Sequence, residues 1–438
     1  MIDKILPGIA GIDIGSEHFF VAAAGAPEAV RRFGTFTSEI KLLAAYLKEH
    51  KVAKVAMEAT GVYWIPLHDH LECQGLEVTV FNGAHARNLP GRKSDVQDCQ
   101  WHAILHSHGL LSSCFIPPQE ILELRAFYRL REDHLSMAAS HIQHMQRALD
   151  LMNVRLHTVI SQIHGVSGLR VIRAILAGER DPHKLATLCD LQILSKKREQ
   201  VIKSLEGNWR EHHLFALRQA LECYEFYQEK IADCDRQIDQ ALTKLRGGQP
   251  PVQPSAGGKK LRHNAPRIEN LHGKLLSLSG GCDPTLIAGI SSLSFMKLMG
   301  EVGTDLCAWP TEKHFTSWLG LAPGKHQSGK RKRRVPRPKT VAGQIFRDCV
   351  MSIAKSKYTA LGAFYRRLKA RKGPAVAATA VARKLAELYY RAMTKGMEYV
   401  ERGVAHYEEV YRQQTLRYLN KMAAAFGLAV TKPTAPTP

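Results

Sequence analysis

Two long heptad repeats constrain the fold of this chain more than any other feature of its sequence. Apolar residues recur with gaps of three and four over residues 135–163, and again over residues 214–245. Such spacing predicts long helices that pack along a narrow seam, as an antiparallel hairpin, as an oligomerising coiled coil or in a plain helical bundle. The second seam is imperfect, because Gln228 and Asp235 occupy two of its ten positions. The seam positions are Leu135, Ala138, Ile142, Met145, Leu149, Met152, Leu156, Val159 and Ile163, followed by Leu214, Leu217, Leu221, Tyr224, Gln228, Ile231, Asp235, Ile238, Leu242 and Leu245.

Ahead of these repeats, short apolar runs alternate with stretches of helical spacing. Residues 8–24 predict two strands around a polar turn, and a third strand is expected near 29–36. Further along, the pattern predicts helices at 38–50 and 61–73 and strands at 52–57 and 76–81. This alternation indicates an α/β domain.

The remainder of the chain differs in amino-acid composition. Residues 246–266 are rich in Gly, Pro and Ser and predict a flexible linker, and the final residues predict a disordered tail. The fold class expected is therefore α/β plus all-α: an α/β N-terminal domain, long coiled-coil helices and a mostly helical C-terminal domain. The expected boundaries are 1–118 for the α/β domain, 119–246 for the coiled-coil region, 247–274 for the linker, 275–410 for the C-terminal domain, and 411–438 for a helix end and tail.

The charge balance indicates a polyanionic partner. The 438 residues carry a formal net charge of +21 and an isoelectric point near 9.6. So large an excess favours nucleic acid over a merely basic soluble protein.

The cysteines and the apolar segments indicate the cellular location of the protein. None of the nine cysteines forms a C-x-x-C pair, which argues against zinc ribbons, and their scattered spacing argues against a disulfide framework. We find no signal-peptide pattern and no apolar run of about 20 residues, the length that a membrane helix requires. We therefore expect a soluble, cytoplasmic protein that associates with the nucleoid when active.

Four carboxylates form the first candidate site. Asp13 lies inside a predicted strand and Glu58 ends another, while Asp95 and Asp98 are three residues apart at the start of a helical run. Mg²⁺ prefers oxygen ligands, and phosphoryl chemistry uses such ions. Singly, each residue fits a cap or a solvated charge better; together, their order and strand context favour a metal site. His102, four residues after Asp98, is a weaker candidate for a ligand or proton carrier.

The second candidate is Ser328, in a loop punctuated by Gly and Pro at residues 320–330. Residues 325–347 carry nine Lys or Arg and no Asp or Glu. Cations stabilise charge on a phosphate under attack by a hydroxyl. From composition alone, however, a serine in a plain nucleic-acid-binding loop is the preferable interpretation. Phosphate-binding residues are expected in two basic segments: Arg87, Arg92 and Lys93, then Lys325, Lys330, Arg331, Lys332, Arg333, Arg334, Arg337 and Lys339.

The motifs around these residues closely resemble the DEDD-type transposases of insertion sequences, which include the Piv/MooV-like recombinases. The resemblance spans nearly the whole chain and rests on long, ordered motifs. They are GIDIG at Asp13, MEATGVYWIPL at Glu58, NLPGRKSDVQDCQW at Asp95 and Asp98, FIPPQEILELRAFYR, VSGLRVIRAILAGERDP, and GLAPGKHQSGK at Ser328.

The resemblance implies a RuvC-like domain of the RNase H fold, in which Asp13, Glu58, Asp95 and Asp98 hold Mg²⁺, and a C-terminal serine transposase domain. It implies that Ser328 attacks a DNA phosphate and forms a covalent intermediate. It also implies a structured bridge RNA that pairs with donor and target DNA, and a dimer or tetramer with composite sites. Two other hypotheses stay open: a RuvC-like nuclease or Holliday-junction resolvase without a covalent intermediate, and an inactive nucleic-acid-binding relative.

Overall fold

The computed structural model describes residues 5–83, 95–248, 250, 252, 264–323, 327–328, 331–332, 340–356, 359–397 and 403–429. The chain divides into two compact units, residues 1–116 and 117–438. Each unit has its own hydrophobic core.

A mixed five-stranded sheet forms the centre of the first unit. Its strands are β1 (Ile9–Ile14), β2 (His18–Ala23), β3 (Arg31–Gly34), β4 (Lys54–Glu58) and β5 (Glu77–Phe81), in the spatial order β3-β2-β1-β4-β5. The first three strands form an antiparallel meander, whereas β4 and β5 run parallel to β1. This sheet with its helices is compatible with the RNase H-like domain that the motifs imply.

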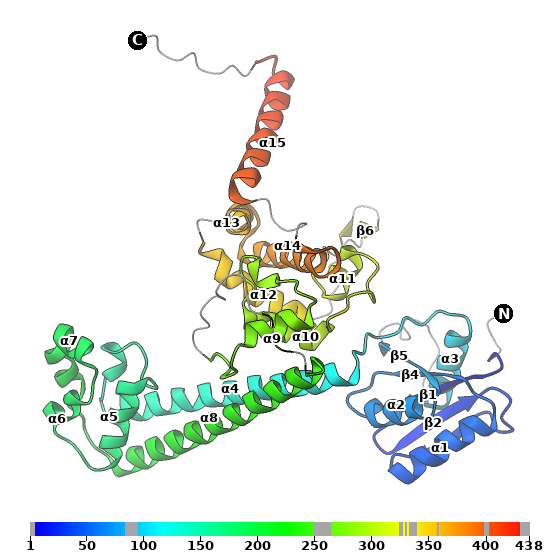
Figure 1. The fold of residues 1–438 in the computed structure, drawn as a ribbon, viewed down its shortest axis with the longest axis horizontal. Coiled ribbons are helices and arrows are strands. Elements are labelled where there is room, and N and C mark those ends of the chain that lie inside the picture. Colours follow the sequence, from blue (N-terminus) through cyan, green and yellow to red (C-terminus); the bar gives the residue numbers. More distant parts are fainter. Residues whose placement is uncertain are drawn as a thin grey trace. The chain divides into compact units, whose positions relative to one another are not determined.

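Helices cover both faces of this sheet (Figure 1). Helix α1 (Thr37–Glu49) and helix α2 (Trp64–Cys73) share one core with alternate strand residues, including Ile12 and Met57. Helix α3 (Asp95–Ser107) packs on β1, β2 and β4, and Leu105 joins Ala56 and Phe81 in a smaller cluster. The helix predicted from residue 61 begins at Trp64, because residues 60–63 form hydrogen-bonded turns first.

The two predicted long helices pack on each other within the chain (Figure 1). They are α4 (Gln119–Leu151) and α8 (Glu211–Leu245). The Nζ atom of Lys244 lies 3.0 Å from a carboxylate oxygen of Glu123, so the end of α8 meets the beginning of α4. The pair is therefore an antiparallel hairpin.

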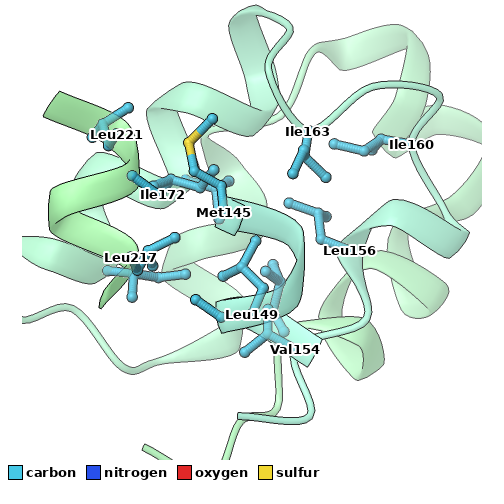
Figure 2. Close-up of a cluster of buried hydrophobic side chains, with 14 of the residues drawn as sticks. Met145, Leu149, Val154, Leu156, Ile160, Ile163, Ile172, Leu217 and Leu221 are labelled. Atoms are coloured by element: carbon cyan, nitrogen blue, oxygen red, sulfur yellow. The ribbon is translucent and has the colours of Figure 1, made fainter. Parts of the chain in front are cut away.

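A small helical subdomain closes the far end of this hairpin. It contains α5 (Val166–Leu176), α6 (Pro182–Thr187), α7 (Leu191–Ser204) and the 3-10 turn Leu156–Thr158. The heptad pattern predicted a helix that continued to Ile163, but α4 ends at Leu151. Leu156 and Ile163 instead fill the core of the subdomain together with Met145 and Leu217 (Figure 2).

One polar seam position holds a buried ion pair. Asp235 of α8 accepts from the Arg131 guanidinium of α4 at 2.5 Å, and both side chains are almost wholly buried. The second Asp235 oxygen accepts from the backbone N–H of Arg267 at 2.9 Å, and Arg131 also donates to the carbonyl of Asn264. The irregular seam position therefore attaches residues 264–267 to the hairpin.

The rest of the second unit is mostly helical. Its elements are α9 (Leu271–Leu278), the 3-10 turn Pro284–Leu286, α10 (Ser292–Val302), α11 (Glu312–Trp318), β6 (Gln327–Ser328), β7 (Arg331–Lys332), α12 (Val341–Ala354), α13 (Ala360–Lys372), α14 (Pro374–Lys395) and α15 (Gly403–Ala425). Phe315, Phe346 and Tyr389 pack ring against ring in its core. Helix α15 crosses the boundary predicted at residue 410. Among the described helices, none has an apolar stretch long enough to cross a bilayer.

A buried carboxylate connects α10 to the first turns of α4 in the hairpin. The Glu301 carboxylate accepts hydrogen bonds from Nε and Nη2 of Arg129, each at 2.9 Å, and from the Tyr128 hydroxyl. Arg125 donates to the backbone carbonyls of Gly300 and Glu301. Burial and the neighbouring Glu301 carboxylate raise the pKa of Tyr128. These contacts connect the C-terminal helices directly to α4.

Candidate active site

Asp13 and Glu58 are neighbours on one face of the sheet. In the parallel pairing of β1 with β4, Ile12 is in register with Met57, so Asp13 and Glu58 lie one position further along the two strands. Because side chains alternate along a strand, both acids point away from the α1–α2 core that holds Ile12 and Met57. They therefore lie on the face that α3 covers.

Gly83 makes room for the Glu58 carboxylate. A Cβ atom at Gly83 would stand 1.8 Å from Oε1 of Glu58 and 2.8 Å from Oε2, far inside van der Waals contact. Gly83 follows β5, and β5 pairs with β4 up to the Glu58–Phe81 position. The end of β5 thus forms one wall of the space that the carboxylate occupies.

Helix α3 lies directly against β1 because residue 11 is a glycine. A Cβ atom there would stand 2.2 Å from the Cys99 carbonyl oxygen and 2.4 Å from the Ala103 nitrogen. Burial raises the pKa of the Cys99 thiol to about 12, with a further contribution from the negative charge of Asp13. The beginning of α3, which carries Asp98 next to Cys99, therefore lies beside the Asp13 end of the strand.

His102 is a packing residue in this structure. Its side chain is buried, its Nδ1 lies 3.2 Å from the carbonyl oxygen of Ile12, and its ring meets the Phe81 ring edge to face. It therefore ties α3 to β1 and β5 one residue away from Asp13. This arrangement is that of a residue that positions α3.

The four predicted metal ligands are brought together only in part. Asp13 and Glu58 come from adjacent strands, and α3 places Asp98 on the covering helix. The backbone of Asp95 begins α3, but its side chain lies outside the described part of the structure. Within the described residues, no group of three His, Cys, Asp or Glu side chains is close enough to hold one metal ion.

Ser328 belongs to the second unit, in a short antiparallel ribbon. β6 pairs with β7 so that Ser328 is opposite Arg331 and Gln327 is opposite Lys332. Of these four residues the structure describes the backbone alone. The register places a cationic residue type directly across from the predicted nucleophile.

Most of the predicted phosphate-binding residues lie outside the described residues. This applies to Arg87, Arg92, Lys93, Lys325, Lys330, Arg333, Arg334, Arg337 and Lys339, whereas Arg331 and Lys332 form β7. Sequence reasoning missed the roles of Gly11 and Gly83. A glycine inside a strand, as in GIDIG, is a usable signal for close backbone approach, but Gly83 follows its strand and carries no such signal.

Two family models match separate segments of the chain. Residues 10–154 match a transposase model of the DEDD type from the IS110 group, and residues 285–366 match the transposase family IS116/IS110/IS902. The matches include Asp13, Glu58, Asp95, Asp98 and Ser328 and cover about half of the chain. No curated protein matches the sequence.

These matches define the class of the molecule: it is a transposase, an enzyme that acts on DNA. The chain belongs to the IS110/IS116/IS902 family of insertion-sequence transposases.

Proposed function

We propose that this transposase is RNA-guided and that it cuts and rejoins DNA through Ser328, with help from magnesium-binding carboxylates of a RuvC-like domain. The observation that carries the proposal is the placement of Asp13 and Glu58 side by side on the sheet face that α3 covers. Two carboxylates that lie side by side on one sheet face supply oxygen donors to the same space, which supports a metal site there.

The donor set fits Mg²⁺ in chemical type. Asp13, Glu58, Asp95 and Asp98 would hold the ion, and all four supply the hard oxygen atoms that magnesium prefers. Bound there, the ion would stabilise negative charge on a reacting phosphate. The protein keeps the Glu58 carboxylate in place against Gly83 and holds α3 on β1 through Gly11 and His102.

Ser328 is the proposed nucleophile. Its hydroxyl oxygen would form an ester bond to the DNA phosphorus while the bond to the leaving strand breaks, and the oxygen of that strand would reverse the step during rejoining. Arg331, opposite Ser328 in the ribbon, and the basic residues of 325–339 would offset the charge on the phosphate. The nucleophile and the carboxylates belong to different compact units, so the proposal requires a dimer or tetramer whose composite sites bring them together.

The proposed partners are donor DNA, target DNA and a structured guide RNA. Lys and Arg contacts to phosphates would supply affinity without reading sequence, and base pairing with the RNA would supply specificity. The net charge of +21 supports this division of roles.

Covalent capture tests the proposal. The protein is incubated with its RNA and labelled junction DNA and resolved under denaturing conditions. We expect a protein–DNA adduct with the wild type, none with Ser328→Ala, and an unchanged adduct with Ser352→Ala, an exposed serine on α12. A Ser328→Ala protein that still recombines DNA would remove this residue from the chemistry.

The carboxylates and the metal have a separate test. Asp13→Ala and Asp98→Ala should stop strand cleavage while the melting temperature stays near that of the wild type. Cleavage that continues unchanged in EDTA contradicts the metal site.

A RuvC-like nuclease, in which water attacks the phosphate, is the second candidate. The carboxylate pair lies in a compact unit of its own, separate from the unit that holds Ser328, and this favours the alternative. Metal-dependent cleavage without an adduct would identify it. Salt-sensitive binding without cleavage under any metal would instead identify an inactive relative.

A further inference from the structure

The exposed end of α13 carries a dense group of cations. The first half of this helix is anchored in the protein, since Leu361 and Tyr365 are buried. The second half emerges into solvent, and four of its residues are exposed cations, which we call the α13 cluster: Arg366, Lys369, Arg371 and Lys372. The anchored half of α13 therefore fixes where the charge is presented.

Within the described residues, no acid offsets this charge nearby in the sequence or through an ion pair. Residues 349–386 contain nine Lys or Arg and no Asp or Glu. Among the described residues, no carboxylate forms an ion pair with any member of the α13 cluster, whereas Arg383 and Lys384 of α14 pair with Glu387 and Arg391 pairs with Glu312. The guanidinium of Arg366 donates to the backbone carbonyl of Ser356, a contact that holds the arginine without neutralising it.

Helix stability alone does not account for the charge. Cations near a helix C-terminus offset the helix dipole, which amounts to about half a negative charge at that end. Lys369, Arg371 and Lys372 supply three positive charges in the last turn of α13. The helix dipole therefore offsets only a small part of their charge.

We propose that the α13 cluster binds the phosphate backbone of DNA as a contact separate from the basic loop at Ser328. Four cations over seven residues extend along about 9 Å of helix, a length over which duplex DNA carries about five phosphate charges. The matched family region ends at residue 366, so three members of the cluster lie beyond it. The proposal rests on the DNA-directed function of the family, and it does not depend on the proposed metal or nucleophile.

The test is the salt dependence of DNA binding by the full-length protein. Binding to a fluorescent mixed-sequence duplex is followed by anisotropy between 50 and 500 mM NaCl in EDTA, where the proposed magnesium chemistry plays no part. Each phosphate contact contributes about 0.9 to the slope of log K against log salt. For the variant K369Q/R371Q/K372Q we expect the slope to fall by about 2.7 and the affinity to fall about 100-fold near 150 mM salt.

A matched control removes the same charge elsewhere. In K230Q/R236Q/K244Q the three cations on α8 are ion-paired with Asp233 or Glu123, so the slope should change by less than about 0.5. Melting temperatures verify folding, and the single variant Arg371→Gln, with an expected slope change of about 0.9, replaces the triple variant if that variant does not fold.

Three results would overturn the proposal. One is a wild-type slope in the triple variant. The second is an equal loss in the control, which would attribute the effect to net charge. The third is unchanged DNA binding with weakened binding of a labelled structured RNA, which would assign the cluster to RNA.

Discussion

Replacing Gly83 by alanine would place a methyl group in the space that the Glu58 carboxylate occupies. The added Cβ would stand 1.8 Å from Oε1, whereas contacts under 3.0 Å are essentially never seen for a real Cβ atom. The carboxylate must therefore retreat by more than about 1 Å, because the methyl group is fixed to the backbone. A misplacement of about 1 Å in a reacting group can lower a catalysed rate by about 100-fold.

We therefore expect Gly83→Ala to lower metal-dependent cleavage of a junction substrate by about 100-fold, measured as the single-turnover rate constant. DNA binding should stay at the wild-type level, because Gly83 carries no charge. Gly165→Ala is the matched control, since its added Cβ would meet nothing closer than 3.3 Å. Its rate should equal that of the wild type.

A compensating substitution makes this prediction specific to Glu58. Aspartate at position 58 is shorter by one methylene, about 1.5 Å, and should fit beside the new methyl group. The rate of G83A/E58D should therefore equal that of Glu58→Asp alone, although both single variants are impaired. If Gly83→Ala cleaves at the wild-type rate, or if the two substitutions act additively, Glu58 does not act from the position that the structure gives it.

Three further predictions concern packing. Asp235→Ala leaves the Arg131 guanidinium buried without its partner and should lower the free energy of unfolding by about 3–5 kcal/mol in urea titrations; a loss below 1 kcal/mol would mean that the ion pair is not buried. Gly300→Ala directs a methyl group to within 2.8 Å of the Tyr128 ring and should lower the free energy of unfolding by about 1–3 kcal/mol, measured in the same urea titrations. An unchanged free energy of unfolding would mean that α10 does not pack tightly on α4. His102→Leu keeps most of the packing volume but loses the hydrogen bond to a strand carbonyl, so it should lower the free energy of unfolding by about 1–3 kcal/mol. The affinity for Mg²⁺, measured by calorimetry, should not change. Weaker Mg²⁺ binding would instead make His102 a ligand.

Local patterns in the sequence were sufficient for the secondary structure of the first unit and for the two long helices. Strand alternation located β1, β4 and β5 to within a few residues, since one buried face imposes a period of two. The same reasoning went wrong at the end of α4. Apolar spacing continued past Leu151 because Leu156 and Ile163 are also buried, although the chain had already turned at Asn153, whose φ of 55° is left-handed.

The candidate site could likewise be predicted from the sequence only in part. The residue types Asp13, Glu58, Asp95 and Asp98 could be selected from sequence, because oxygen ligands near strand ends are recognisable from composition and position. The closeness of Asp13 and Glu58 in space could not be predicted from sequence, because the β1–β4 register pairs residues about 45 positions apart and depends on long-range packing. The close contact of Gly83 with Glu58 also depends on that packing.

By itself, then, the sequence determined which segments form strands and helices, which residues carry acid, hydroxyl and positive charge, and which family the motifs resemble, because each follows from residue type and local period. The tertiary structure alone decided that the two seams pack in one hairpin, that Asp13 and Glu58 share a sheet face, and that the charges of α13 remain unpaired by carboxylates among the described residues. Each of these depends on contacts between segments far apart in the chain, and no local pattern encodes which distant segment a given face will meet.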